Sequence, residues 1–98
     1  MQLLIHRRAE IALRSLQQTE QGQIGRALEK LSDLDKASLH TSPKFHRIAS
    51  LMSGKKLFIF EGNKKLLLVL SFDEDTCVIE DIVDHDRLKK LGAIGGQA

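Results

Sequence analysis

The residues best suited to chemistry gather between residues 55 and 88. Lys64 and Lys65 stand immediately before a long apolar run, and His85 follows the next apolar run. If the two runs are neighbouring strands, we expect the ammonium groups and the imidazole to reach one end of a sheet. Cations beside a group that titrates near neutral pH suit a phosphodiester better than a small apolar ligand. The sequence therefore indicates that any reaction of this chain takes place here.

Charge is distributed unevenly along the chain, although the formal net charge is only +2. Residues 36–65 contain seven basic side chains and one acid, whereas residues 66–86 contain seven acids and neither lysine nor arginine. This pattern is typical either of an ordinary solvated surface or of a basic face that binds nucleic acid. The basic side chains are Lys36, Lys44, Arg47, Lys55, Lys56, Lys64 and Lys65.

The length of 98 residues predicts a single domain, which we place at residues 1–91, with a disordered tail at residues 92–98. The N-terminal apolar run is too short for a signal peptide, and no segment approaches the roughly 20 apolar residues of a membrane span. Cys77 is the only cysteine, and its place in an apolar run favours a buried side chain over a nucleophile. We therefore expect a soluble, cytoplasmic protein that contacts no membrane.

Hydrophobic periodicity predicts two helices in the first third of the chain, after a short strand at residues 2–6. The polar residues 17–22 interrupt the helical pattern, and a second apolar stripe then runs from Ile24 to Leu34. Residues 36–54 contain the only proline, so we expect a loop with a short extended piece at residues 45–51. Two helices of this kind form a hairpin that must cover a sheet.

Apolar runs and turn residues in the second half of the chain predict the strands of that sheet. Strands are expected at residues 57–61, 66–72 and 77–83, with turns at Gly62-Asn63 and at residues 73–75, and a final helical turn at residues 87–91. The predicted fold class is α+β: an antiparallel sheet of three to four strands packed against an N-terminal helical hairpin, in the order β-α-α-β-β-β.

Three local motifs accompany this order of elements. They are Lys56-Leu57-Phe58-Ile59-Phe60, Gly62-Asn63-Lys64-Lys65-Leu66-Leu67 and Asp84-His85-Asp86-Arg87-Leu88. Together they resemble the RelE/ParE superfamily of bacterial toxins over roughly residues 2–91, in particular the YafQ/RelE-like branch. The resemblance implies a RelE-like fold and a toxin of a type II toxin–antitoxin system, held inactive by an antitoxin from the same operon.

The two branches of the superfamily imply different activities. In the RelE branch the toxin cleaves messenger RNA in the ribosomal decoding site, and in the ParE branch it inhibits DNA gyrase without the RNase residues. The chain departs from the RelE pattern at three positions. Lys64 replaces an aromatic residue, Lys65 replaces an arginine, and Lys89 replaces the aromatic that closes the motif. Lysine keeps the charge but loses the bidentate fork of arginine.

RNA cleavage by such a domain would use the 2′-OH of the substrate as nucleophile, with a base, an acid and cations on the transition state. His85 is the best candidate for acid or base, because the imidazole serves in either form near neutral pH. Asp81 or Asp84 could orient it. Lys65 would place its ammonium on the scissile phosphate, and Lys56 could reach it from the adjacent strand, although both could also be solvated residues at strand ends.

Further cations are candidates for RNA binding. They are Arg47, Lys55, Lys64 and Arg87. Arg87 could equally be a partner for nearby acids, and His46 is more typical of an ordinary loop histidine. Glu80, Asp84, His85 and Asp86 give no convincing metal site, so neither a metal nor a cofactor is expected.

Two functions from different classes follow. The first, which we prefer, is a ribosome-associated endoribonuclease that acts on messenger RNA through His85, Lys65 and Lys56. The alternative is a ParE-like or catalytically degenerate binding module that docks on a protein target such as DNA gyrase. An antitoxin partner is expected under both.

Overall fold

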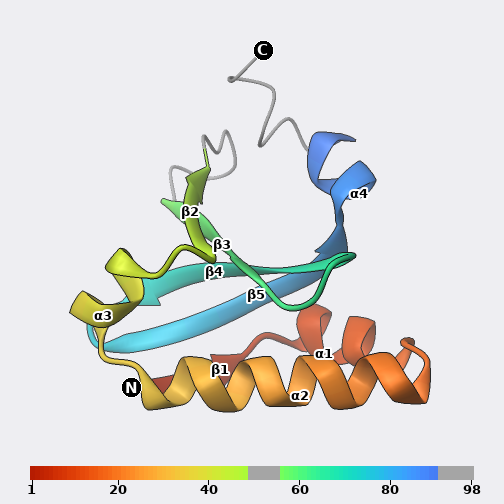
Figure 1. Cartoon of the computed structure of the whole chain (residues 1–98), viewed down its shortest axis with the longest axis horizontal. Helices are drawn as coiled ribbons and strands as arrows, with labels where there is room; N and C mark the ends of the chain where they lie inside the picture. The colour runs from red at the N-terminus through yellow and green to blue at the C-terminus, as the bar shows by residue number, and fades with distance from the viewer. Residues whose placement is uncertain (49–55, 91–98) are drawn as a thin grey trace.

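The computed structural model describes residues 1–48 and 56–90 and has an α+β fold (Figure 1). Five strands form one sheet in the order β1-β5-β4-β3-β2, and four helices accompany it in the described part of the chain. The elements in chain order are β1 (Gln2–Ile5), α1 (Arg7–Arg14), α2 (Gln18–Asp33), α3 (Lys36–Thr41), β2 (Phe45–Ile48), β3 (Leu57–Glu61), β4 (Leu66–Asp73), β5 (Thr76–Asp84) and α4 (His85–Lys90).

The sheet differs from the predicted one in strand number and direction. β2, β3, β4 and β5 form an antiparallel meander, but β1 lies parallel to β5, where Leu3 pairs with Cys77 and Ile5 pairs with Ile79. The predicted antiparallel sheet of three to four strands was therefore wrong. The parallel pair joins the two halves of the chain, and local patterns do not specify pairing between residues so distant in sequence.

The helices also differ from the prediction at two places. α2 begins at Gln18, so the polar residues expected to separate the helices already form its first turn. α3 occupies part of the expected loop, and its start is explained by Asp35, whose Oδ1 accepts from the Ser38 backbone N–H at 2.7 Å. That hydrogen bond lowers the pKa of the Asp35 carboxyl, because it stabilises the charged form at the helix N-cap.

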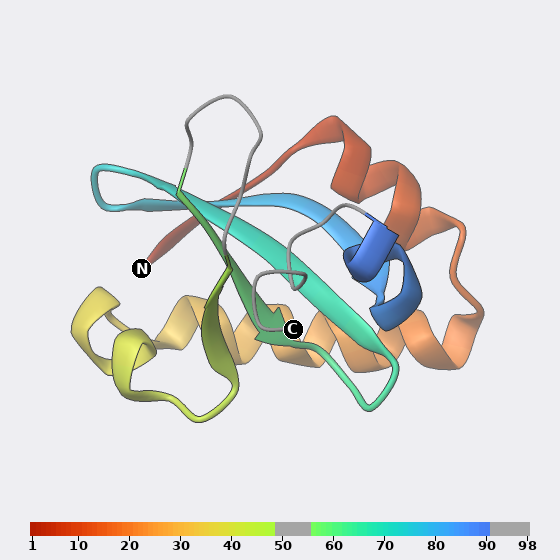
Figure 2. The same cartoon turned by 90° about the horizontal axis from the view of Figure 1, so that it is seen from above.

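The two faces of the sheet carry separate apolar clusters. α1 and α2 cover one face, which we call the helix face, and its buried residues include Ile24, Leu31, Leu68 and Ile79 (Figures 1 and 2). The second face, which we call the opposite face, carries a second buried cluster. Its members are Ile48, Ile59, Leu67, Val69 and Val83. β4 contributes alternately to both clusters, as expected of a central strand.

The elements that bound the opposite face stand at its two ends. In Figure 1, β2 rises above the sheet on one side and α4 rises above it on the other.

A register shift between Val69 and Leu70 leaves Glu80 as the extra residue of β5. Among the described residues, no helix is both long enough and apolar enough to cross a membrane.

Candidate functional site

Lys65 and His85 lie at the same end of the sheet. Leu66, the first residue of β4, pairs with Asp84, the last residue of β5. Lys65 precedes Leu66 and His85 follows Asp84, so the antiparallel register sets them opposite each other. The structure thus brings together two of the three residues for which the sequence predicted a catalytic role.

Asn63 fixes the turn that presents Lys65. Its Oδ1 accepts from the backbone N–H groups of Lys65 at 2.8 Å and Leu66 at 2.6 Å, and its Nδ2 donates to Gln23 Oε1 at 2.8 Å. The turn is therefore tied to α2 and does not depend on the β3–β4 hairpin alone. The Lys65 ammonium is exposed and lies 4.0 Å from Glu20, a distance at which an ion pair holds a side chain weakly.

His85 is exposed at the first residue of α4. The two carboxylates expected to orient its ring are engaged elsewhere. Asp84 Oδ1 accepts from the Arg87 backbone N–H at 2.7 Å, while Asp81 Oδ1 accepts from the Ile82 N–H at 2.8 Å. The second oxygen of Asp81 lies 3.7 Å from the Arg87 guanidinium. Arg87 thus partners local acids, which is the alternative role that the sequence allowed it.

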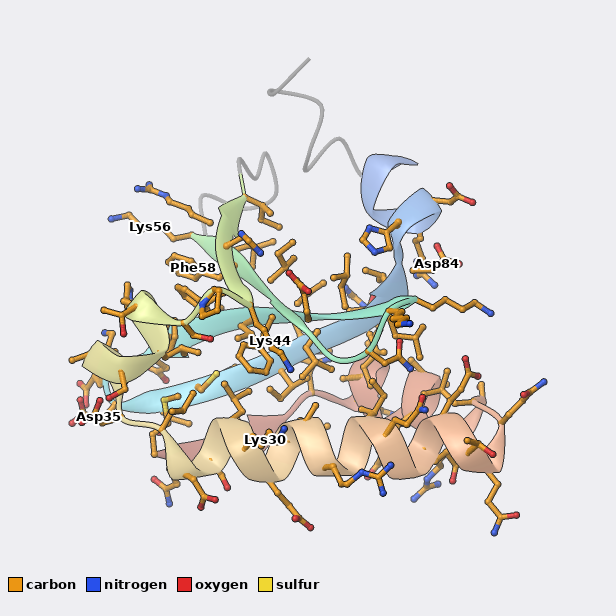
Figure 3. The ribbon with its side chains drawn as sticks, in the orientation of Figure 1. Lys30, Asp35, Lys44, Lys56, Phe58 and Asp84 are labelled. Carbon is orange, nitrogen blue, oxygen red and sulfur yellow. The ribbon has the colours of Figure 1, made fainter. Side chains whose placement is uncertain are left out.

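Lys56 lies at the other end of the sheet. Because Phe58 pairs with Leu70, Lys56 stands opposite Phe72, six residues from Leu66 along β4. Six strand residues span about 20 Å, and Figure 3 shows Lys56 and Asp84 at opposite sides of the molecule. Lys56 precedes β3 and Lys65 precedes β4, and these two strands are antiparallel, so the two lysines lie at opposite ends of the strand pair.

The predicted RNA-binding cations divide in the same way. Arg47 is exposed on β2, opposite Phe58, at the Lys56 end. Lys64 is exposed in the β3–β4 turn and lines a cleft of about 300 Å³ that also contains Arg26, Lys30 and Lys44. Figure 3 shows Lys30 on α2 and Lys44 ahead of β2 in the space between helix and sheet. Lys55 lies outside the described residues, as does the tail at residues 92–98.

A histidine–carboxylate pair stands on the opposite face. His46 Nε2 lies 3.0 Å from Glu61 Oε2 across β2 and β3. His46 pairs with Ile59 and Glu61 pairs with Leu67, and both of these partners belong to the opposite-face cluster. The pair therefore lies over the buried apolar residues of that cluster. His46 belongs to a strand and not to a loop, and its carboxylate partner was not anticipated from the sequence.

Glu61 of this pair lies near the Lys65–His85 end, whereas His46 pairs with Ile59, which faces Val69, four residues along β4 from Lys65. Leu67 faces Glu61 on one side and Val83 on the other, which makes a row across β3, β4 and β5. Lys65 and His85 are each two residues beyond this row, or about 7 Å along their strands. His46 and Glu61 lie on the opposite face and His85 is exposed at this end of the sheet, whereas the Lys65 ammonium lies beside Glu20 of α2, the helix that covers the other face. Groups of these types can exchange protons and hold an anion.

Comparison with known proteins supports the fold. No family model matches the chain, and no curated protein matches it. A solved structure of a copper-bound mutant toxin from Helicobacter pylori is similar, with a TM-score of 0.54 over 90% of this chain and 98% of that chain. The two sequences are 13% identical, so the likeness concerns the fold. This protein therefore shares its α+β fold with a bacterial toxin. In the present chain, the described residues contain no group of three or more His, Cys, Asp or Glu side chains suited to a metal.

Proposed function

We propose that this chain is the toxin of a type II toxin–antitoxin system and that it cleaves messenger RNA on the ribosome. The observation that carries the proposal is the 3.0 Å contact between His46 and Glu61, with Glu61 two residues along the strands from the end where Lys65 and His85 are opposite in register. The fold shared with a bacterial toxin supports it. The proposal includes a single RelE-like domain over residues 1–91 and an antitoxin partner from the same operon.

The proposed reaction assigns a role to each group. His46, oriented by Glu61, takes the proton of the substrate 2′-OH, whose oxygen then attacks the neighbouring phosphorus. The bond from phosphorus to the 5′-oxygen breaks, and His85 protonates that leaving oxygen. A 2′,3′-cyclic phosphate and a free 5′-hydroxyl result. Lys65 stabilises the charge on the phosphorane-like transition state, which requires it to turn away from Glu20.

The basic cleft beside the turn gives the RNA a path to this site. Arg26, Lys30, Lys44 and Lys64 line it, and Glu61 is its only acidic lining residue among those described. A cation-lined groove of this kind binds the phosphate backbone without reading its sequence. We assign this groove to the RNA backbone adjacent to the scissile phosphate.

A protein-binding module is the second candidate. Two observations favour it: Lys56 stands about 20 Å from the Lys65–His85 end, and Asp81 and Asp84 are engaged with Arg87 and backbone groups instead of His85. In this alternative the chain is ParE-like or catalytically silent, and it acts by docking on a protein such as DNA gyrase.

Mapping of messenger RNA 5′ ends after brief induction tests the proposal. The wild-type chain should produce new ends phased with codons. His46→Ala and His85→Ala should each reduce these ends by about 100-fold or more, because each removes a proton-transfer group. Glu61→Gln should cause a smaller loss, since the imidazole remains. Glu29→Gln, an exposed change of the same type on α2, is the matched control.

Two results would contradict the endoribonuclease, and another would contradict its proposed mechanism. Growth arrest without new ends would indicate the protein-binding module, and a gyrase supercoiling assay would then identify or exclude that target. Ends that persist in His46→Ala would remove the histidine–glutamate pair from the mechanism. Neither arrest nor new ends, with folded protein present, would mean a silent relative of the toxins.

A further inference from the structure

A second cleft opens at the end of the sheet away from Lys65 and His85. Its volume is about 690 Å³, and it lies between α3 and the ends of β3, β4 and β5 that are near Lys56. Its lining includes Lys36, His40, Lys56, Phe58, Phe72 and Asp73. The proposed cleavage reaction uses none of these residues, and Lys56 in the cleft stands about 20 Å along the strands from the Lys65–His85 end.

Aromatic rings form one wall of the cleft. The His40 and Phe72 rings are stacked at 6.1 Å with an interplanar angle of 27°, and the Phe58 ring meets Phe72 edge-on at 5.5 Å. Phe45 extends the cluster behind them, stacked on Phe58 at 5.0 Å. The Phe58 and Phe72 side chains are only half-buried. A rigid set of rings with partly exposed surfaces is a platform for another flat ring.

Charges of both signs surround this platform. The Lys36 ammonium lies 5.1 Å above the centre of the Phe72 ring, and Lys56 is exposed at the rim. Asp73 supplies an exposed carboxylate on the same cleft, and His40 is held in place by its Nδ1 contact with the Lys36 carbonyl at 2.8 Å. A purely apolar ligand would leave these charges unmatched, and a simple polyanion would not use the rings.

We propose that this cleft binds one nucleotide, with the base on the aromatic wall and the phosphate between Lys36 and Lys56. Asp73 accepts a hydrogen bond from an amino group of the base or from a ribose hydroxyl. The same chemistry is offered by a free nucleotide and by an unpaired nucleotide within single-stranded RNA. The proposal goes beyond RNA cleavage, because binding here requires neither His46 nor His85.

Fluorescence of 2-aminopurine riboside 5′-monophosphate provides the first test. The chain contains neither Trp nor Tyr, so the probe is read with little protein background, and stacking quenches it. We expect saturable quenching that is weakened roughly tenfold by Phe58→Leu and by Phe72→Leu. Lys36→Ala and Lys56→Ala should weaken the phosphorylated probe but not the riboside without phosphate. Arg14→Ala, an exposed cation change on α1, should have no effect.

A single-stranded hexaribonucleotide with one 2-aminopurine distinguishes the two sources. Binding at least tenfold tighter than that of the monophosphate assigns the cleft to RNA, and equal or weaker binding assigns it to a free nucleotide. His85→Ala should bind both probes like the wild type, so a failure of the cleavage mechanism would not affect this result.

Two results would overturn the proposal. One is the absence of saturable quenching with either probe. The other is quenching that is unchanged in the lysine variants, whose exposed side chains can be removed without disturbing the core. Circular dichroism of the phenylalanine variants shows whether they fold, and the lysine variants decide the question if they do not.

Discussion

At the scale of single residues, Cys77 shows how burial sets chemistry. Its side chain in β5 has no exposed surface, and burial raises the pKa of its thiol from 9.0 to about 12. The thiolate, which is the reactive form, is therefore excluded from the folded protein at neutral pH. Cys77 acts as a small apolar residue of the core, as the sequence predicted.

This burial predicts a loss of stability in mild alkali. The pKa is higher in the folded state than in the unfolded state, so between about pH 9 and pH 12 the unfolded chain loses the thiol proton and the folded chain keeps it. The free energy of unfolding should then fall as pH rises, by up to about 1.4 kcal/mol per pH unit. Urea denaturation between about pH 8 and pH 10 measures this slope. Cys77→Ala should show a shallower slope, and equal slopes would contradict the prediction.

The histidine–glutamate pair marks the limit of prediction at this scale. His46 could be weighed as a candidate because imidazole is a versatile group, and Glu61 stands out as the only acid among residues 36–65. Their contact, however, depends on the register of β2 against β3. A shift of one residue would send the two side chains to different faces, and no local pattern specifies that register.

At the scale of elements, Gly62 determines how closely the β3–β4 turn approaches α2. A Cβ at this position would lie 2.6 Å from Ile24 Cδ1 and 3.3 Å from the Leu66 carbonyl oxygen. Ile24 is fully buried and has little room to move. By contrast, a Cβ at Gly22 or Gly25 on α2 would meet no atom within 4 Å. The glycines of this region therefore have different roles.

Alanine substitutions should separate these roles. Gly62→Ala is expected to lower the free energy of unfolding by about 1–3 kcal/mol through overpacking. Gly25→Ala should raise it by about 0.5–1 kcal/mol, because alanine favours the helix and meets free space. Adding Ile24→Val to Gly62→Ala removes the clashing methyl group and should recover part of the loss. Denaturant titration checks all three variants, and a neutral Gly62→Ala would contradict the described contact.

The sequence predicted the local elements better than their assembly. The strands at residues 57–61, 66–72 and 77–83 and the turn at Gly62-Asn63 are confirmed, because alternation and turn residues are local signals. α3 was missed because its six residues are too few for a periodic pattern, although its Asp35 cap was visible in the sequence. The sequence placed Lys65 and His85 at the same end of the sheet, as the register has them. It also placed Lys56 within reach of that end, which was wrong because β3 and β4 run in opposite directions.

At the scale of the whole molecule, the sheet order predicts where the structure is most resistant to opening. β4 lies between β3 and β5, and its residues are buried on whichever face of the sheet they point to, from Leu66 to Ser71. β2 is an edge strand of four residues, with His46 and Arg47 exposed. Local stability should therefore decrease from the centre of the sheet towards β2.

Native-state hydrogen exchange tests this gradient. We expect amides of β4 paired with β5 to exchange only through global unfolding, and amides of β2 to exchange at least about 100-fold faster. Ile82→Val in β5, which trims a buried side chain of the main cluster, should speed exchange in β4 and β5 together. Equal protection of β2 and β4 would mean that the sheet opens as one unit.

The parallel pairing of β1 with β5 determines when the sheet can be completed during synthesis of the chain. Leu3 finds its partner Cys77, and the His6 N–H finds the Ile79 carbonyl, only after the ribosome has made almost the entire chain. Until then the nascent chain lacks the strand that lies between β1 and β4, together with the core residues that β5 contributes. Contacts between such distant residues form late because a long loop must close first. The sheet of this protein is therefore completed only at the end of its synthesis or after it.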